Sequence, residues 1–185
     1  MKKLLAAAAV AALMGACSQS APPVPRPRGF ARVEAYADSL ATCTIAGVSI
    51  GVSAEAVRTA PRADWLDAAF GRHRATLHLS VAHPADARAL TEAMENRTER
   101  IALNLPGAAE VSDFNTPGGF AVRLVESLEP SPVPLQFMAT DSSGTFISGA
   151  VAITGPVVPA DSAAAAVADL RRQLLLTLNS LSRCR

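Results

Sequence analysis

Alternating apolar and polar residues predict several β-strands, and the clearest run covers residues 74–82. There Leu77 and Leu79 alternate with His78 and Ser80. A period of two is typical of a strand that buries one face and exposes the other. The same reasoning predicts three more strands and a hairpin with a turn at residues 141–144. The further strands cover residues 30–36, 44–52 and 120–124, and those of the hairpin cover residues 135–140 and 145–153.

Two later segments carry apolar residues at spacings of three and four, which is typical of helices with one buried stripe. The first covers residues 86–103, has Asp86 as its N-cap, and presents Leu90, Met94, Arg97 and Ile101 on one side. The second covers residues 162–182, is capped by Asp161 or Ser162, and carries a stripe of leucines.

Strands joined by tight turns must run antiparallel, so we expect an α+β domain with a single antiparallel β-sheet flanked by helices. The order of the elements resembles the Mog1/PsbP-like α/β/α sandwich, in which a helix follows the early strands and another closes the chain. Residues 63–70 show no clear period. We interpret Trp65, Leu66 and Phe70 as core anchors, with an exposed recognition patch as the alternative.

The N-terminus has the features of a secretory leader. Lys2 and Lys3 precede an apolar run that ends at Met14, which is shorter than the about 20 residues needed to span a bilayer. The segment Leu13-Met14-Gly15-Ala16-Cys17 resembles a bacterial lipobox. We therefore predict a lipoprotein signal peptide at residues 1–16 and lipidation of Cys17, with an ordinary leader and an incidental cysteine as the alternative.

A proline-rich stretch follows the predicted lipidation site. Residues 17–29 include Pro22, Pro23, Pro25 and Pro27, which favour extended polyproline geometry, so we expect a spacer between the membrane and a single domain at residues 30–185. Ser18 and Gln19 supply no Asp retention signal beside Cys17. The expected location is the outer membrane, facing the periplasm, with the inner membrane as the alternative.

The charge balance argues against nucleic acid as a partner. Both lysines lie in the leader, and the remaining cations are arginines that nearly balance the 16 acidic residues. Nucleic acids are held largely through neutralised phosphates, and the chain has no basic cluster for this.

Two cysteines remain outside the leader, in a compartment where disulfides form. We predict a disulfide between Cys43 and Cys184, and two separate thiols are the alternative.

No assembled catalytic or metal site is evident in the sequence. His73, His78 and His83 are spaced by five, so along one strand neighbouring rings point to opposite faces, which disfavours a metal site. Ser80 or Ser142 could be combined with His78 and Asp141 as a hydrolytic triad, but Gly-x-Ser-x-Gly is absent. We therefore expect no catalytic residue, no metal and no cofactor.

The hairpin tip is the candidate partner contact, because loop tips present side chains on a rigid support. A structural turn is the alternative, since Asp and Ser at such positions bond the nearby backbone. The predicted contact residues are Gln136, Thr140, Asp141, Ser142 and Phe146.

Several of these segments together resemble the gliding-motility lipoprotein GldD family of Bacteroidota. The likeness lies in residues 73–80 (HRATLHLS), 136–142 (QFMATDS) and 146–150 (FISGA), with Arg28-Gly29-Phe30, Cys43 and Asp161-Ser162 at matching places. It implies a non-enzymatic envelope lipoprotein that works with the gliding-motility or type IX secretion machinery and so has envelope proteins as partners. The alternatives are a periplasmic lipoprotein that binds a small ligand or lipid and, less favoured, a hydrolase.

Overall fold

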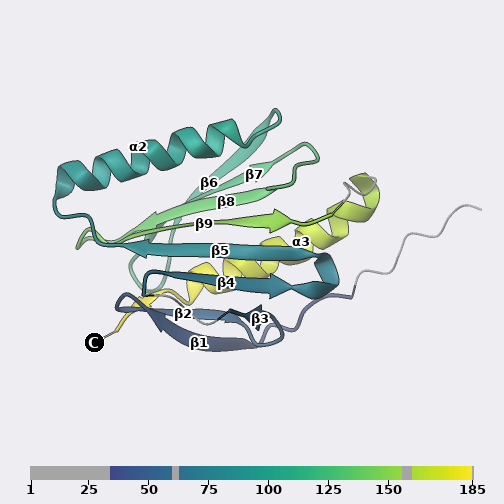
Figure 1. Ribbon diagram of the computed structural model, residues 1–185, viewed down its shortest axis with the longest axis horizontal. Coiled ribbons are helices and arrows are strands. Elements are labelled where there is room, and N and C mark those ends of the chain that lie inside the picture. Colours follow the sequence, from purple (N-terminus) through teal and green to yellow (C-terminus); the bar gives the residue numbers. More distant parts are fainter. Residues whose placement is uncertain (1–33, 60–62, 156–159, 185) are drawn as a thin grey trace, which may run out of the picture. The chain divides into compact units, whose positions relative to one another are not determined.

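Seven antiparallel strands form the larger of two sheets in the computed structural model, which describes residues 34–59, 63–155 and 160–184 (Figure 1). The order of strands across this sheet is β3-β4-β5-β9-β8-β7-β6. Its strands are β3 (Val57–Arg58), β4 (Trp65–Phe70), β5 (Ala75–Ala82), β6 (Ala109–Asn115), β7 (Ala121–Ser127), β8 (Leu135–Thr140) and β9 (Phe146–Ile153).

A second sheet of three strands has the order β1-β2-β10. It contains β1 (Leu40–Ile45), β2 (Val48–Ser53) and the short C-terminal strand β10 (Ser182–Arg183). The Ala46-Gly47 turn joins β1 and β2, and both residues have positive φ, 45° and 76°. Positive φ at both central positions is the geometry of a two-residue hairpin whose twist suits the strands it joins.

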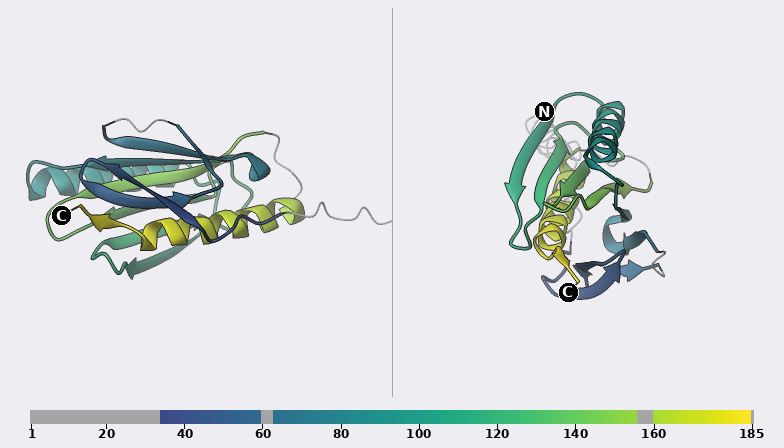
Figure 2. Two further views of the ribbon diagram at one scale, coloured as in Figure 1. Left: turned by 90° about the horizontal axis from the view of Figure 1, so that it is seen from below. Right: turned by 90° about the vertical axis from the view of Figure 1, so that its left-hand side faces the viewer.

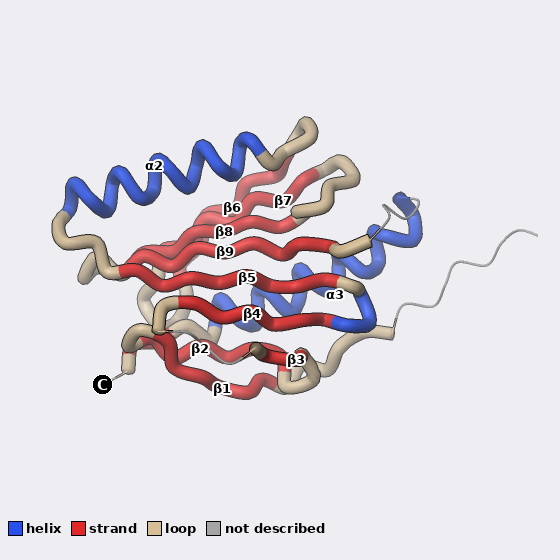
Figure 3. The backbone as a smooth tube through the Cα atoms, viewed as in Figure 1, coloured by secondary structure: helices blue, strands red, loops and turns tan. Residues whose placement is uncertain are grey.

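Two helices cover opposite faces of the larger sheet (Figures 1 and 2). Helix α2 (Ala87–Leu103) lies over β8 and β9, and helix α3 (Ala160–Asn179) lies on the other face and packs against β2. A 3-10 turn, η2 (Gly71–His73), links β4 to β5. Figure 3 shows the same arrangement with helices and strands in separate colours.

The main core lies on the α3 side of the larger sheet. The leucine stripe of α3 consists of Leu170, Leu174 and Leu178, and Leu181 continues it just after the helix. These side chains are at most 1% exposed and pack with the inward side chains of both sheets. Burying a leucine contributes about 1.5–3 kcal/mol, so this stripe is a main source of stability. The α2 face differs, because within α2 only Ile101 is buried.

The described elements confirm several sequence predictions. Strand β5, the β8–β9 hairpin and the start of α2 lie where they were expected, and Asp86 accepts a hydrogen bond from the Ala89 amide at 2.8 Å as the N-cap. The described residues belong to one compact unit, Ala31–Arg185. The signal peptide, Cys17, the proline-rich spacer and residues 30–33 of the first predicted strand lie outside the described residues.

Other predictions about the elements are wrong. The prediction of a single sheet fails because the β1–β2 hairpin and β10 form a sheet of their own. The strand predicted over residues 44–52 contains the Ala46-Gly47 turn, and residues 34–36 are not a strand. Residues 63–70, which show no clear period in the sequence, contain strand β4. Helix α3 ends at Asn179, because the Ser180 hydroxyl and β10 bind the backbone of β2.

Candidate functional site

A groove lies between α2 and the strands β4, β5 and β9, on the face of the larger sheet opposite the main core. Its volume is about 740 Å³. It exists because the apolar stripe of α2 is narrow and contains Arg97, so the helix covers only part of the sheet. Side chains of β5 alternate between the two faces of the sheet, and its polar side, with His78 and Ser80, forms part of the groove lining.

The β-strand wall of the groove carries two polar pairs. His78 Nδ1 lies 2.6 Å from Asp67 Oδ1, because the two residues are direct cross-strand partners on β5 and β4. The Ser80 hydroxyl lies 3.1 Å from the Ser148 hydroxyl, its partner on β9. His78 is therefore positioned by a carboxylate, whereas the two serines bind each other.

The helical wall is cationic. Arg97 Nη2 donates a hydrogen bond to the Gly149 carbonyl oxygen at 2.5 Å, and its buried Nε has no hydrogen-bond partner among the residues that the structure describes. Arg100 lies one turn further along α2 and also lines the groove. Burial, with a smaller effect from the nearby Arg100, holds the pKa of Arg97 below its usual range. Within the described part of the chain, neither arginine has a carboxylate at ion-pair distance.

The structure does not assemble the triad considered from the sequence. His78 binds Asp67, whereas Asp141 lies at the β8–β9 turn and binds Arg183 at 2.6 Å. The other two histidines also have structural partners: His73 binds Asp169, and His83 Nε2 lies 2.7 Å from the Ala46 carbonyl oxygen. Across the described ranges, no group of three or more His, Cys, Asp or Glu residues is arranged to hold a metal ion.

The predicted contact surface at the hairpin tip is only partly exposed. Gln136 is fully buried and donates a hydrogen bond to the Ile101 carbonyl oxygen, and Phe146 is 7% exposed, so the prediction that these two side chains face a partner is wrong. Both side chains lie on the face of the larger sheet that α2 covers, which is why they are buried. Thr140 is half-buried and Ser142 exposed. Partner binding at the tip stays a prediction.

Asp141 has a structural role in this turn. It accepts hydrogen bonds from the Thr145 amide, from both the amide and the hydroxyl of Ser143, and from Arg183 of β10. Burial alone would raise the pKa of Asp141, but these hydrogen bonds outweigh it and lower the pKa to about 2. The carboxylate thus links the turn to the C-terminal strand.

The predicted disulfide between Cys43 and Cys184 is absent, and among the described residues each is a free thiol. The Cys43 thiol lies 3.5 Å from the Ile50 carbonyl oxygen and packs against the core. Its neighbour Thr44 points to the other face of β1, and the Cys184 sulfur lies 3.6 Å from the Thr44 hydroxyl. The two sulfurs are therefore on opposite faces of the smaller sheet, which rules out a bond between them without rearrangement.

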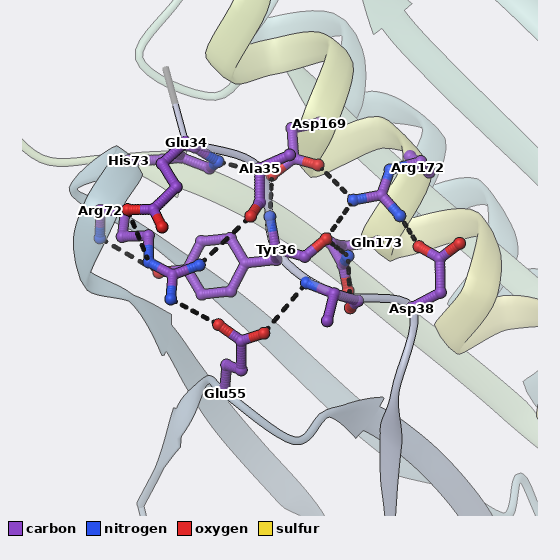
Figure 4. Close-up of polar contacts among 11 residues, drawn as sticks. Glu34, Ala35, Tyr36, Asp38, Glu55, Arg72, His73, Asp169, Arg172 and Gln173 are labelled. Carbon is purple, nitrogen blue, oxygen red and sulfur yellow. Dashed lines mark hydrogen bonds and ion pairs between the residues drawn. The ribbon is translucent and has the colours of Figure 1, made fainter. Parts of the chain in front are cut away.

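A buried polar cluster, which we call the clamp, joins residues 34–38 to α3 and η2 (Figure 4). At its centre, Asp169 Oδ2 lies 2.7 Å from His73 Nε2 and accepts a hydrogen bond from the Tyr36 amide at 3.0 Å. Asp169 also forms an ion pair with Arg172, which donates a second hydrogen bond to the Tyr36 carbonyl oxygen. Gln173 donates to the same carbonyl oxygen and to that of Ala37.

Aromatic contacts and a second set of ion pairs complete the clamp. The Tyr36 ring packs edge-on against Phe70 and His73, with centroids 5.1 and 5.2 Å apart. Arg72 lies over the Tyr36 ring at 4.6 Å and forms an ion pair with Glu55. The Tyr36 hydroxyl accepts a hydrogen bond from the Arg72 amide at 3.1 Å. The first described residues are thus held by several elements at once.

The sequence alone did not identify the main polar residues of the groove and of the clamp, Asp67 and Asp169. Asp67 lies in a strand whose alanines hide its period, and Asp169 lies within a helix in which a polar residue predicts exposure. One usable signal was present: Asp169, Arg172 and Gln173 are spaced by three and four in α3, so they share a face beside the leucine stripe.

No helix in the described part of the chain is long and apolar enough to cross a membrane. Comparison of the chain with protein-family models and with curated proteins finds no match.

Proposed function

We propose that this chain is a non-enzymatic lipoprotein of the bacterial envelope, similar to GldD, anchored through acylated Cys17. Its proposed location is the outer membrane, facing the periplasm, with the inner membrane as the alternative. In this proposal it acts by binding protein components of the gliding-motility or type IX secretion machinery, and it needs neither a cofactor nor nucleic acid.

The clamp is the observation that carries this proposal. Residues 34–38 are the first described residues, and four residues separate them from the predicted spacer, so a pull exerted through the lipid anchor would reach the domain close to them. A segment at that position usually frays unless contacts hold it. Here Asp169, Arg172 and Gln173 hold it through hydrogen bonds to its backbone, and Arg72 holds it from η2. Such a junction suits a tethered docking subunit.

The groove supports a binding role over a hydrolytic one. A nucleophilic serine would need hydrogen-bond contact with a base that a third group orients. His78 has its orienting carboxylate, Asp67, but the Ser80 hydroxyl is bonded to Ser148. We therefore keep hydrolysis as the least favoured alternative.

The same groove favours a second candidate function, in which the lipoprotein binds a small ligand. Its volume of about 740 Å³ falls within the roughly 300–1,000 Å³ of small-molecule sites, and it has polar groups on both walls. We also propose that the fold is of the Mog1/PsbP-like kind, which is supported by helices on opposite faces of an antiparallel sheet.

Crosslinking in intact cells tests the docking function. The full chain is crosslinked, recovered from envelopes in neutral detergent, and the proteins attached to it are identified by mass spectrometry. The Cys17→Ala variant is the matched control, because it keeps the folded domain and loses the proposed anchor. Specific recovery of gliding or type IX secretion subunits with the anchored form is the expected result. Recovery of the chain alone, or with the same proteins for both forms, would contradict the proposal.

A further inference from the structure

The geometry points to a binding site for a small anion in the groove beneath α2. We propose that Arg97 and Arg100 bind a carboxylate or phosphate group of a small ligand, and that its hydroxyl groups face the polar strand wall. This inference rests on the second candidate function, binding of a small ligand in the groove, and names the chemistry of that ligand. It depends on neither the docking function nor the lipid anchor.

Arg97 is the main reason for this assignment. A guanidinium has five N–H donors, yet Arg97 uses Nη2 on the Gly149 carbonyl oxygen and leaves its buried Nε without a partner. A buried charged donor that lacks a hydrogen bond is costly. Attaching α2 to the sheet needs only the Nη2 contact, and the guanidinium lines the groove, so the terminal N–H groups that this contact leaves over are available to a ligand that enters there.

The second arginine strengthens the preference for an anion. Arg100 lines the same groove and lowers the pKa of Arg97 further, beyond the main effect of burial. Two neighbouring cations without a carboxylate partner repel each other, and an anion between them would relieve this repulsion. Guanidinium groups match carboxylate and phosphate oxygens in bidentate geometry.

The opposite wall determines what else the ligand carries. Asp64 and Asp67 line it, together with His78 and the Ser80–Ser148 pair. Asp67 Oδ1 is already in hydrogen-bond contact with His78. Carboxylates accept hydrogen bonds from hydroxyl groups, whereas hydroxyls and an imidazole can both donate to them and accept from them. We therefore infer a polyhydroxylated anion, whose anionic end lies at α2 and whose hydroxyls lie toward β4 and β5.

Titration calorimetry on the purified full chain in a neutral detergent at low salt tests the site. The probes are glycerol 3-phosphate, gluconate and, as the uncharged comparison, glycerol. Saturable binding of either anion, with no binding of glycerol, is the expected result. Binding of the phosphate alone or of the carboxylate alone would support the site and assign its anionic group.

Three variants locate the binding. We expect Arg97→Gln and Arg100→Gln each to weaken binding of the anion by at least about ten-fold, because each removes a charged donor. Among the described residues the Arg100 side chain forms no hydrogen bond or ion pair, so Arg100→Gln remains informative if Arg97→Gln perturbs α2. The matched control is Arg88→Gln, whose side chain is 87% exposed on α2, and its affinity should be unchanged. No saturable anion binding, or equal affinity in Arg100→Gln and wild type, would overturn the inference.

Discussion

Asp169 Oδ2 and His73 Nε2 lie 2.7 Å apart, and their side chains are only 6% and 2% exposed. The contact joins α3 to η2 across 96 residues of sequence, and the Tyr36 amide binds the same oxygen. A buried carboxylate is tolerated only when its hydrogen bonds are made. Asp169 meets this condition with three different partners, so it is the central residue of the clamp.

Removing this carboxylate should destabilise the domain strongly. In Asp169→Ala, His73, Arg172 and the Tyr36 amide lose their shared acceptor. We expect the free energy of unfolding to fall by about 3–5 kcal/mol, as measured by urea denaturation. The control is Arg88→Ala, which removes an exposed i,i+4 ion pair with Glu92 and should change the value by no more than about 0.5 kcal/mol. Equal losses in the two variants would show that the clamp does not stabilise the domain.

The link between Asp141 and Arg183 should make the free energy of unfolding fall as the pH is lowered into the acid range. The pKa of Asp141 is about 2 in the folded protein, below the ordinary 3.8, because hydrogen bonds outweigh the opposing effect of burial. Its contribution is therefore complete above pH 3.8 and is lost as the pH falls toward 2. Urea unfolding between pH 2 and 5 should show this loss, and Asp141→Asn should remove this component of it.

Asp113→Asn is the matched control for that pH series. Hydrogen bonding to Arg123 lowers the pKa of Asp113 too, but this pair is exposed on β6 and β7, so solvent screens it. We expect a smaller change in the acid dependence for Asp113→Asn than for Asp141→Asn. The reverse order would show that Asp141 does not hold the hairpin tip to β10.

Gly149 on β9 should tolerate no side chain. A Cβ at this position would lie under 3.0 Å from the His78 carbonyl oxygen and from the Phe137 ring, and neither can move freely in the packed sheet. We expect Gly149→Ala to lower the thermal midpoint of unfolding and to reduce the free energy of unfolding by at least about 2 kcal/mol. Gly71→Ala is the control, because nothing lies within 4 Å of its Cβ, and its stability should change by no more than about 1 kcal/mol. Similar midpoints for the two variants would mean that β5 and β8 leave room for a side chain at position 149 of β9.

Both thiols should react without prior reduction. Cys184 is exposed and should be alkylated first, whereas Cys43 should react slowly, because burial raises the pKa of its thiol. Intact-mass analysis of the Cys17→Ala variant, alkylated in the absence of reductant, would show two added groups. A mass lower by two hydrogens, with neither thiol modified, would indicate a disulfide and a rearranged smaller sheet.

The sequence predicted elements well where one physical signal dominated. Leu77 and Leu79 of β5 alternate cleanly with polar residues, and Asp86 is a favoured N-cap, so both features were located. Strand β4 was missed because Ala68 and Ala69 dilute the contrast between its faces. The Ala46-Gly47 turn was missed because Ala is unusual at positive φ, where Asn or Asp is the common signal.

Neither the groove nor the clamp could be assembled from the sequence, because their partners are distant along the chain. Asp67 meets His78 through strand register, and Asp169 meets Tyr36 through the packing of α3, 133 residues apart. Local patterns contain no information on such pairs. The cysteines illustrate the same limit, since spacing could not reveal that Cys43 and Cys184 lie on opposite faces of one sheet.

Metabolic labelling with radioactive palmitate tests the proposed membrane anchor most directly. The wild-type chain, Cys17→Ala and the matched control Cys43→Ala are expressed in a bacterium with a lipoprotein pathway, and label in the purified chain is counted. We predict label in the wild type and in Cys43→Ala, found in the outer-membrane fraction, and none in Cys17→Ala. Equal labelling of all three, or no label in the wild type, would contradict the account of this chain as a lipoprotein anchored at Cys17.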